Sequence, residues 1–229
     1  MHFNGSLWQD ITTSLNTQTN TICGITNSFS PFVTAEIDQA PQIASPQPIA
    51  ATATTNAGTA VTYNKPIATD DFDSTVPVNC TPQSGSNFAL GKTTVVCTAT
   101  DSAGNSSSKT FDVTVTFAWS GVLDPINADG TSIFKLKSAV PVKFRLTGAS
   151  AGVTNAVARL YIAKISNGVM GTELEADSNV SATSGNLFVY DGGSQYHFNW
   201  DTKGQSVGTY QLRIDLGDGV SRTAVISLR

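Results

Sequence analysis

Apolar side chains recur at every second position along much of this chain, and this alternation limits what the chain can fold into. In residues 209–216 the apolar positions are Tyr210, Leu212, Ile214 and Leu216. Residues 109–117 and 140–146 alternate in the same way. Successive side chains of a strand point to opposite faces of a sheet, so period two indicates half-buried strands. No segment with helical periodicity reaches ten residues with caps, so we expect an all-β protein built from tandem sandwiches.

The charge balance narrows the possible partners. Hydrophobic residues make up 40% of the 229 positions, charged residues only 13%, and the net charge is -4. A chain of this size can bury a core. It has no excess of basic residues that could bind a phosphate backbone or an anionic lipid surface. No stretch has the length and apolarity of a membrane span. We therefore expect neither nucleic-acid binding nor membrane insertion; a polysaccharide or a protein surface is possible, and the oligomeric state stays open.

Turn and proline signals divide the chain into three parts. Residues 1–38 read as two strands, 7–15 and 21–30, which form a hairpin or the remnant of a preceding β domain. A proline-rich stretch then opens the second part, residues 39–117. The third part is residues 118–229. Expected strands lie at 60–64, 76–80, 93–101 and 109–117, and then at 132–136, 140–146, 156–166, 186–190, 195–200, 209–216 and 222–228.

Of the three cysteines, Cys80 and Cys97 lie on the inward positions of their expected strands. We therefore expect a disulfide between them, which would stabilise the domain by roughly 3 kcal/mol in the chain-entropy model. Cys23 is either a free thiol or the partner of a cysteine in a missing part of its domain.

The first residues of the chain have neither the basic start nor the apolar run of a signal peptide. Since the composition looks extracellular, we expect the chain to be part of a longer secreted or cell-surface polypeptide.

The second part resembles the hyalin repeat (HYR) domain, which is an Ig-like sandwich. The blocks that carry the resemblance are VTY (61–63), ATDD (68–71), CTPQSGSNF (80–88), LGKTTVVCTATD (90–101) and AGN (103–105). Where that family often has a cysteine before a proline, this chain has Ser45 before Pro46. Any additional disulfide of the family is therefore absent.

The third part resembles the bacterial PxKF domain. The matching blocks are PINADG (125–130), PVKFRL (141–146) and LRIDLGDG (212–219). Modules of both kinds occur in secreted or surface polypeptides, so the two resemblances imply a role in adhesion or spacing. The PxKF family has no activity that could be carried over residue by residue.

One motif raises the alternative of catalysis. GASAG at 148–152 satisfies the G-x-S-x-G pattern of serine hydrolases, with Ser150 as the nucleophile. His197 would be the base, and Asp201 or Asp191 would orient it. Alternation places His197 on the face opposite Tyr196, which favours a solvated strand residue. The motif therefore allows two interpretations. The favoured one is that residues 148–152 form an ordinary turn, and the alternative is that the protein is a small ester or lactone hydrolase.

A group of carboxylates suggests a third hypothesis for the function, a calcium-stabilised adhesin. Asp70, Asp71 and Asp73 form a compact acidic loop, and Asp101 ends a strand of the same domain. Calcium prefers several oxygen ligands, so these four residues are weak calcium candidates. The alternative is that they cap their own turns. Asp124, Asp129, Asp215 and Asp218 allow the same two readings. We expect no other cofactor.

Aromatic residues could form an exposed surface that stacks on sugars. The candidates are Trp119, Tyr161, Tyr190, Tyr196 and Trp200. Packing in the core explains most of them equally well. The function that we expect is therefore a non-catalytic extracellular module for binding, adhesion or spacing in a secreted or surface bacterial protein.

Overall fold

The structure is a computed structural model that describes residues 1–3, 6–16, 21–26, 38–178 and 185–229. Its regular elements within these ranges are strands and one short 3-10 helix, η1 (Gly148–Ser150). The expected all-β fold is confirmed. None of the described helical segments has the length and apolarity needed to span a membrane.

The N-terminal part contains two short antiparallel pairs. Strand β1 (His2–Phe3) pairs with β2 (Trp8–Gln9), and β3 (Thr12–Asn16) pairs with β4 (Thr21–Gly24). The single strand expected at 7–15 is therefore divided. The break lies at Asp10, whose Oδ1 accepts the main-chain N–H of Thr12 at 2.9 Å. Such a local side-chain bond offers the backbone a turn in place of a strand. Of the second expected strand, 21–30, residues 27–30 lie outside the described residues.

The first sandwich is built on a four-stranded sheet in the order β6-β12-β11-β9. Its strands are β6 (Ile49–Thr52), β9 (Val78–Thr81), β11 (Gly91–Thr100) and β12 (Ser106–Thr116). Strand β6 runs parallel to β12, and the other neighbours are antiparallel. Two short pairs complete the domain, β5 (Gln42–Ile43) with β8 (Ala68–Thr69) and β7 (Thr59–Ala60) with β10 (Asn87–Phe88). Ile43 and Phe88 from these pairs are buried in the core together with the sheet.

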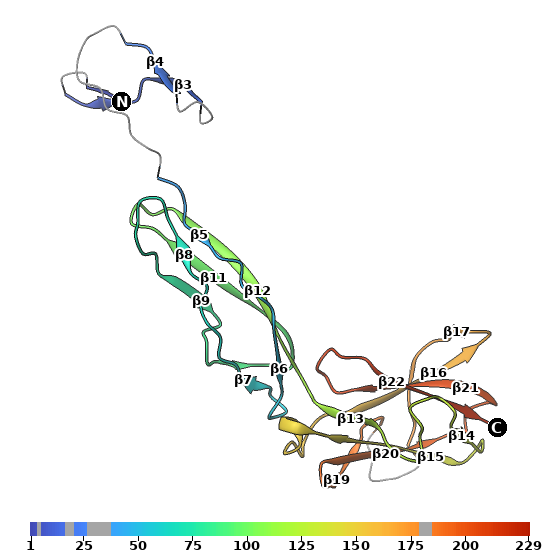
Figure 1. The fold of residues 1–229 in the computed structure, drawn as a ribbon. Helices are drawn as coiled ribbons and strands as arrows, with labels where there is room; N and C mark the ends of the chain where they lie inside the picture. The colour runs from blue at the N-terminus through green and yellow to red at the C-terminus, as the bar shows by residue number, and fades with distance from the viewer. Residues whose placement is uncertain (4–5, 17–20, 27–37, 179–184) are drawn as a thin grey trace.

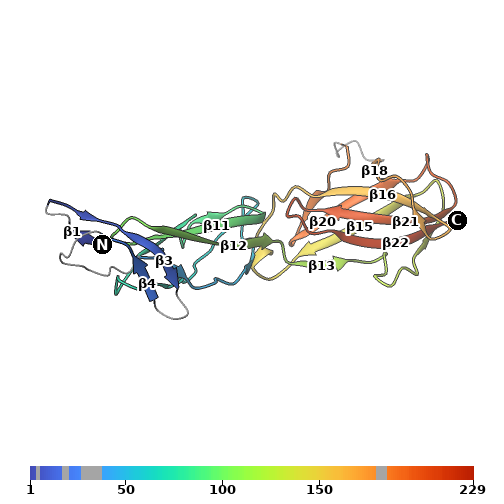
Figure 2. The ribbon, with the colours of Figure 1, turned by 90° about the horizontal axis from the view of Figure 1, so that it is seen from above.

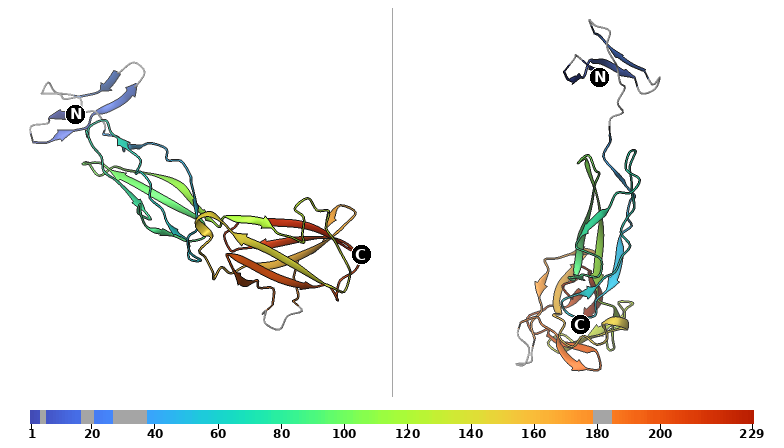
Figure 3. Two further views of the ribbon diagram at one scale, coloured as in Figure 1. Left: turned by 60° about the horizontal axis from the view of Figure 1, so that its bottom comes forward. Right: turned by 90° about the vertical axis from the view of Figure 1, so that its left-hand side faces the viewer.

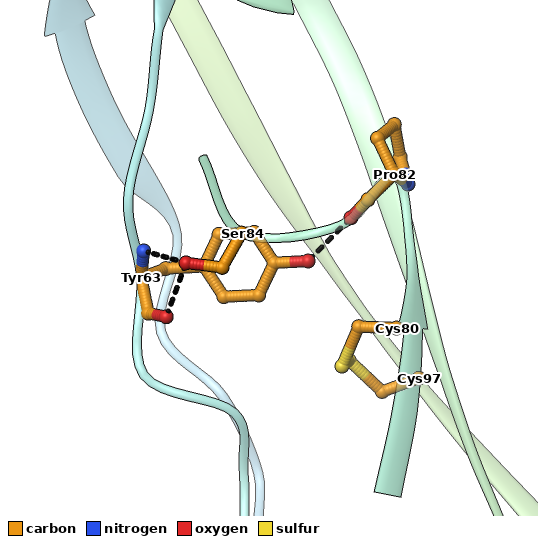
Figure 4. Close-up of a disulfide and its surroundings, with 5 residues drawn as sticks. All are labelled: Tyr63, Cys80, Pro82, Ser84 and Cys97. Atoms are coloured by element: carbon orange, nitrogen blue, oxygen red, sulfur yellow. Dashed lines mark hydrogen bonds between the residues drawn. A yellow bond between two sulfur atoms is a disulfide. The ribbon is translucent and has the colours of Figure 1, made fainter. Parts of the chain in front are cut away.

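Alternation set the inward face of this sheet as expected. Phe111, Val113 and Val115 of β12 are buried, and the residues between them are partly exposed. Cys80 and Cys97 lie opposite each other in the register of β9 and β11 and form the expected disulfide. Figure 4 shows this disulfide beside the hydroxyl of Tyr63, which donates a hydrogen bond to the carbonyl of Pro82 just past β9. The bond joins the loop after β7 to the edge of the sheet.

The second sandwich has two sheets. One has the order β13-β15-β20-β19 and the other β14-β22-β21-β16-β17, with β18 also paired to β16. The strands are β13 (Trp119–Val122), β14 (Ile133–Phe134), β15 (Ala139–Leu146), β16 (Arg159–Ser166), β17 (Val169–Met170), β18 (Leu174–Glu175), β19 (Val189–Gly192), β20 (Gln195–Asp201), β21 (Gly208–Asp215) and β22 (Arg222–Leu228). Strands β13, β17 and β18 were not expected from the sequence.

Large side chains from both sheets fill the core between them. Phe144, Phe198 and Trp200 of the first sheet are fully buried, as are Leu212 and Ile226 of the second. The two sandwiches follow each other end to end (Figure 1, Figure 2). In the left view of Figure 3 the yellow turn η1 lies where they meet.

Candidate functional site

Two residues, Phe117 and Ala118, connect β12 of the first sandwich to β13 of the second. We call these two residues, with the side chains of Ser150, Asp218 and Arg222 that bond to them, the joint. The N–H of Phe117 donates to Asp218 Oδ2 at 2.8 Å. Its carbonyl accepts from Arg222 Nη2 at 3.0 Å. Both polar groups of Phe117 are therefore held by side chains of the second sandwich.

Ser150 fastens the other connecting residue and also reaches the first sandwich. Its hydroxyl oxygen accepts the N–H of Ala118 at 3.2 Å and donates to the carbonyl of Ala53 at 2.7 Å. The carbonyl of Ala118 accepts from the N–H of Thr147 at 2.9 Å. Ser150 has no exposed surface. A single hydroxyl thus links the chain that follows β6, the connecting residues and the turn η1.

Asp218 and Arg222 form a buried ion pair behind Phe117. Arg222 Nη2 lies 2.6 Å from Asp218 Oδ2, and the two side chains are 3% and 0% exposed. Burial alone would raise the pKa of Asp218. The hydrogen bonds from Arg222 and from the Phe117 N–H, together with the attraction of the guanidinium, hold that pKa below its ordinary value. The carboxylate is therefore ionised at neutral pH and can accept from both partners.

The catalytic alternative named Ser150, His197 and Asp201, and the structure does not bring these three together. Both hydrogen bonds of the Ser150 hydroxyl are to main-chain groups. His197 lies on β20 between inward-facing neighbours, as alternation predicted. Its Nδ1 is 3.1 Å from Asp191 Oδ1, in an orientation that makes no hydrogen bond. Asp201 is four residues further along the same strand, roughly 13 Å away, so it cannot orient the imidazole.

Of the four acidic candidates, Asp70 and Asp71 come together, and Asp38 joins them. Asp38, Asp70 and Asp71 each place a carboxylate oxygen within 4.8 Å of the others. Burial of the carboxyl and then the negative charges of Asp101, Asp70, Asp71 and Asp73 raise the pKa of Asp38. Asp73, by contrast, uses both oxygens on Ser102, accepting its N–H at 2.7 Å and its hydroxyl at 2.9 Å.

Asp38 was missed because no local pattern distinguishes it. It immediately precedes the proline-rich stretch, a position where an acidic residue is ordinarily part of a solvated connection. The contact with Asp70 and Asp71 spans more than thirty positions in the sequence and exists only after the domain has folded. The density of aspartates at 70–73 was the available signal, and it identified one side of the cluster.

The five aromatic candidates do not form one platform. Tyr196 and Trp200 are buried in the core, where the Tyr196 hydroxyl donates to the carbonyl of Val153 at 2.8 Å. Trp119 and Tyr190 are partly buried, and they lie on β13 and β19 at opposite edges of one sheet. Tyr161 belongs to the other sheet, and the guanidinium of Arg213 covers its ring at 4.3 Å. The packing explanation therefore holds for Tyr196 and Trp200.

Residues 38–115 match the family model of the HYR domain. This match confirms the first of the two expected resemblances. It begins at Asp38 and ends within β12, so it includes the disulfide and the acidic cluster. A comparison with curated proteins finds no match.

Solved structures with tandem β domains are also similar to this chain. A crystal structure of Dpr2 Ig1-Ig2 in complex with DIP-Theta Ig1-Ig3 is 13% identical, with a TM-score of 0.27, and the match covers 83% of this chain and 65% of that one. Protocadherin Gamma B2 extracellular cadherin domains 3-6 is 19% identical, with a TM-score of 0.27, at 83% and 51% coverage. The tandem Ig repeats of Dlar are 12% identical, with a TM-score of 0.23, at 83% and 97% coverage.

Proposed function

We propose that this chain is a non-catalytic extracellular module of a secreted or surface bacterial protein. In it the HYR domain and a PxKF-like sandwich form one stiff spacer. The spacer holds whatever precedes the HYR domain at a fixed distance and direction from whatever follows the second sandwich. The low net charge of -4 suits contact with a polysaccharide or a protein surface rather than with phosphate. An adhesive role at either end is compatible with this arrangement.

The observation that carries the proposal is the joint. All four main-chain polar groups of Phe117 and Ala118 have a partner, and three of these partners are buried side chains of the second sandwich. These bonds hold the connecting residues to the second sandwich, and the bond from Ser150 to Ala53 crosses to the first. A bend between the sandwiches would break that buried bond, and a buried donor or acceptor left without a partner costs about 1–3 kcal/mol. We therefore expect bent arrangements of the two sandwiches to be sparsely populated.

The same geometry argues against the hydrolase alternative. A catalytic serine needs an accessible hydroxyl and a base within hydrogen-bond reach. The hydroxyl of Ser150 is buried, and it already donates to Ala53 and accepts from Ala118. The pattern at 148–152 is therefore better explained as a turn whose serine closes the joint.

Distance measurements between the sandwiches test the spacer role. Cysteines placed at the exposed, outward positions Thr110 on β12 and Thr223 on β22, in a Cys23→Ser background, would carry spin labels. We expect a single narrow distance distribution from double electron–electron resonance. As the matched control, two labels within the second sandwich, at Thr223 and Lys203, give the width that the labels alone produce. A distribution between the sandwiches that is several times broader than this control would overturn the proposal.

A chromogenic ester assay tests the non-catalytic assignment. We expect no hydrolysis above buffer, and the same rate for the wild type, Ser150→Ala and His197→Ala. A turnover that persists through purification and disappears in both variants would instead establish the hydrolase.

A further inference from the structure

The end of the first sandwich that is remote from the joint carries the acidic cluster. Gly91, at one end of β11, pairs with Val115 next to the joint, and Asp101 follows the other end of the same ten-residue strand. We propose that Asp38, Asp70, Asp71 and Asp101 bind one calcium ion at this end of the HYR domain. This goes beyond the spacer role, because the spacer depends on the joint and not on this end.

The first observation is the convergence of carboxylates from separate segments. Asp38 lies ahead of β5, whereas Asp70 and Asp71 follow β8, and an oxygen from each lies within 4.8 Å of the other two. No basic side chain forms an ion pair with these residues in the described part of the chain. Carboxylates this close repel one another unless a proton or a cation lies among them. Ca²⁺ takes oxygen ligands at 2.3–2.6 Å, typically six to eight of them.

The second, independent observation is a set of buried carboxylate oxygens that lack partners. Asp101 is only 8% exposed, and its Oδ2 has no hydrogen bond. Asp38 Oδ1 and Asp70 Oδ2 are likewise buried without partners. Native proteins rarely leave buried polar atoms unpaired, and a bound ion is one of the usual reasons for such an atom. The loop of Asp101 lies against Asp38, because Asn105 donates its N–H to Asp101 Oδ1 and its side-chain Nδ2 to the carbonyl of Asp38.

In Asp70 and Asp101, the oxygen that does have hydrogen-bond partners holds the carboxylate in place. Asp70 Oδ1 accepts the N–H groups of Phe72 and Asp73, at 3.1 and 2.9 Å. Asp101 Oδ1 accepts the N–H of Asn105 at 2.7 Å. One oxygen of each carboxylate thus holds the side chain in its loop, and the other remains for a ligand. Such preorganisation limits the freedom that is lost when the ion binds.

Ion access is provided by a surface depression beside the cluster. It is lined by Gln39, Ala40, Gln42, Thr69, Asp70 and Asp71.

Asp73 is not a ligand of the proposed ion, because both of its carboxylate oxygens accept hydrogen bonds from Ser102. That contact joins the loop after β8 to the loop after β11. The segment of Asp38 is held to these loops by longer hydrogen bonds of 3.4 Å, from the N–H of Gln39 to Asp71 Oδ1 and from Asn105 Nδ2 to the carbonyl of Asp38. The ion would reinforce this attachment.

Calorimetric titration of the full chain with CaCl₂, after treatment with EDTA and dialysis, tests the proposal. Extracellular calcium modules bind with Kd on the order of 10⁻⁴–10⁻³ M, so the titration should extend to about 10 mM. We expect one saturable site in the wild type and binding at least tenfold weaker in Asp71→Asn. Asp71 is exposed, so its replacement should leave the fold intact, which circular dichroism would verify. Binding should also weaken in Asp101→Asn, since an amide retains the bond to Asn105 but not the charge.

Asp112→Asn is the matched control, because Asp112 is an aspartate of the same domain whose partners are Lys92 and Thr94. Asp112→Asn should bind calcium with a Kd within about twofold of that of the wild type.

The melting temperature of the wild type should rise with calcium, since a ligand of the folded state stabilises it. MgCl₂ should bind more weakly, because Mg²⁺ gives up its waters reluctantly. The proposal fails if the wild type shows no saturable binding, or if Asp71→Asn titrates like the wild type.

Discussion

The joint depends on a few side chains that combine burial with charge. Arg222 is 3% exposed and donates to Asp218, to the carbonyl of Phe117 and to that of Val220. Its guanidinium also lies 5.6 Å from the centre of the Trp119 ring. Removing one member of a buried ion pair leaves the other charge uncompensated, and this penalty is much larger than the loss of an exposed pair.

Arg222→Met should therefore lower the free energy of unfolding by about 3–5 kcal/mol. Arg213→Met is the control, since Arg213 forms ion pairs with Glu173 and Asp215 at a more exposed place on β21. Its loss should cost at most about 1 kcal/mol. Urea denaturation followed by tryptophan fluorescence measures both. Equal losses in the two variants would contradict the importance that we assign to burial at the joint.

Among the elements, β9 is the strand whose position depends most on a covalent bond. It has four residues at the edge of its sheet and pairs only with β11. The disulfide between Cys80 and Cys97 closes a loop with a sequence separation of 17. Closing such a loop restricts the unfolded chain and thereby stabilises the folded one.

Cys80→Ala/Cys97→Ala should lower the free energy of unfolding by roughly 3 kcal/mol. Reduction of the wild type with dithiothreitol should approach the same value. Cys23→Ala, which removes an exposed thiol, should change the stability by less than about 0.5 kcal/mol. Chemical denaturation of the four samples measures the differences. If the double variant were as stable as Cys23→Ala, then β9 would be held by its hydrogen bonds and core contacts alone.

At the scale of the whole molecule, we expect the joint to make the stability of the protein sensitive to acid. Asp218 forms its ion pair with Arg222 only while it is ionised, and its pKa in the folded state lies below the ordinary value of 3.8. An acid with a lowered pKa in the folded state contributes stability above its ordinary pKa. That contribution is lost as the pH falls through the folded-state value.

We therefore expect the wild type to lose stability below about pH 4, as Asp218 takes up a proton. Asp218→Asn cannot ionise, so it should be less stable than the wild type at pH 7. The difference between the two should shrink as the pH falls below 4. Unfolding free energies measured from pH 7 to pH 2 test this, and taking the difference cancels the contributions of the other carboxylates. A difference that stays constant over this range would show that the charge of Asp218 does not support the joint.

The sequence by itself determined the inward faces of the long strands, whereas it did not predict the short strands β13, β17 and β18. The period of two correctly placed the buried side chains of β12 and the outward side of His197 on β20, and it brought Cys80 and Cys97 together. The expected strand 222–228 has the bounds of β22. These are local properties, because the direction of a side chain follows from its position in a pleated strand.

The tertiary structure alone decided what Ser150, Asp218 and Asp38 do. The bond from Ser150 to Ala53 spans 97 positions, and that from Phe117 to Asp218 spans 101. No periodicity or short motif encodes a contact over such a distance. The G-x-S-x-G pattern and the turn-like aspartates looked local, yet they acquired their partners when distant segments packed together. The pattern of the sequence specifies which face of a strand each side chain occupies, whereas the packing of distant segments specifies what that side chain contacts.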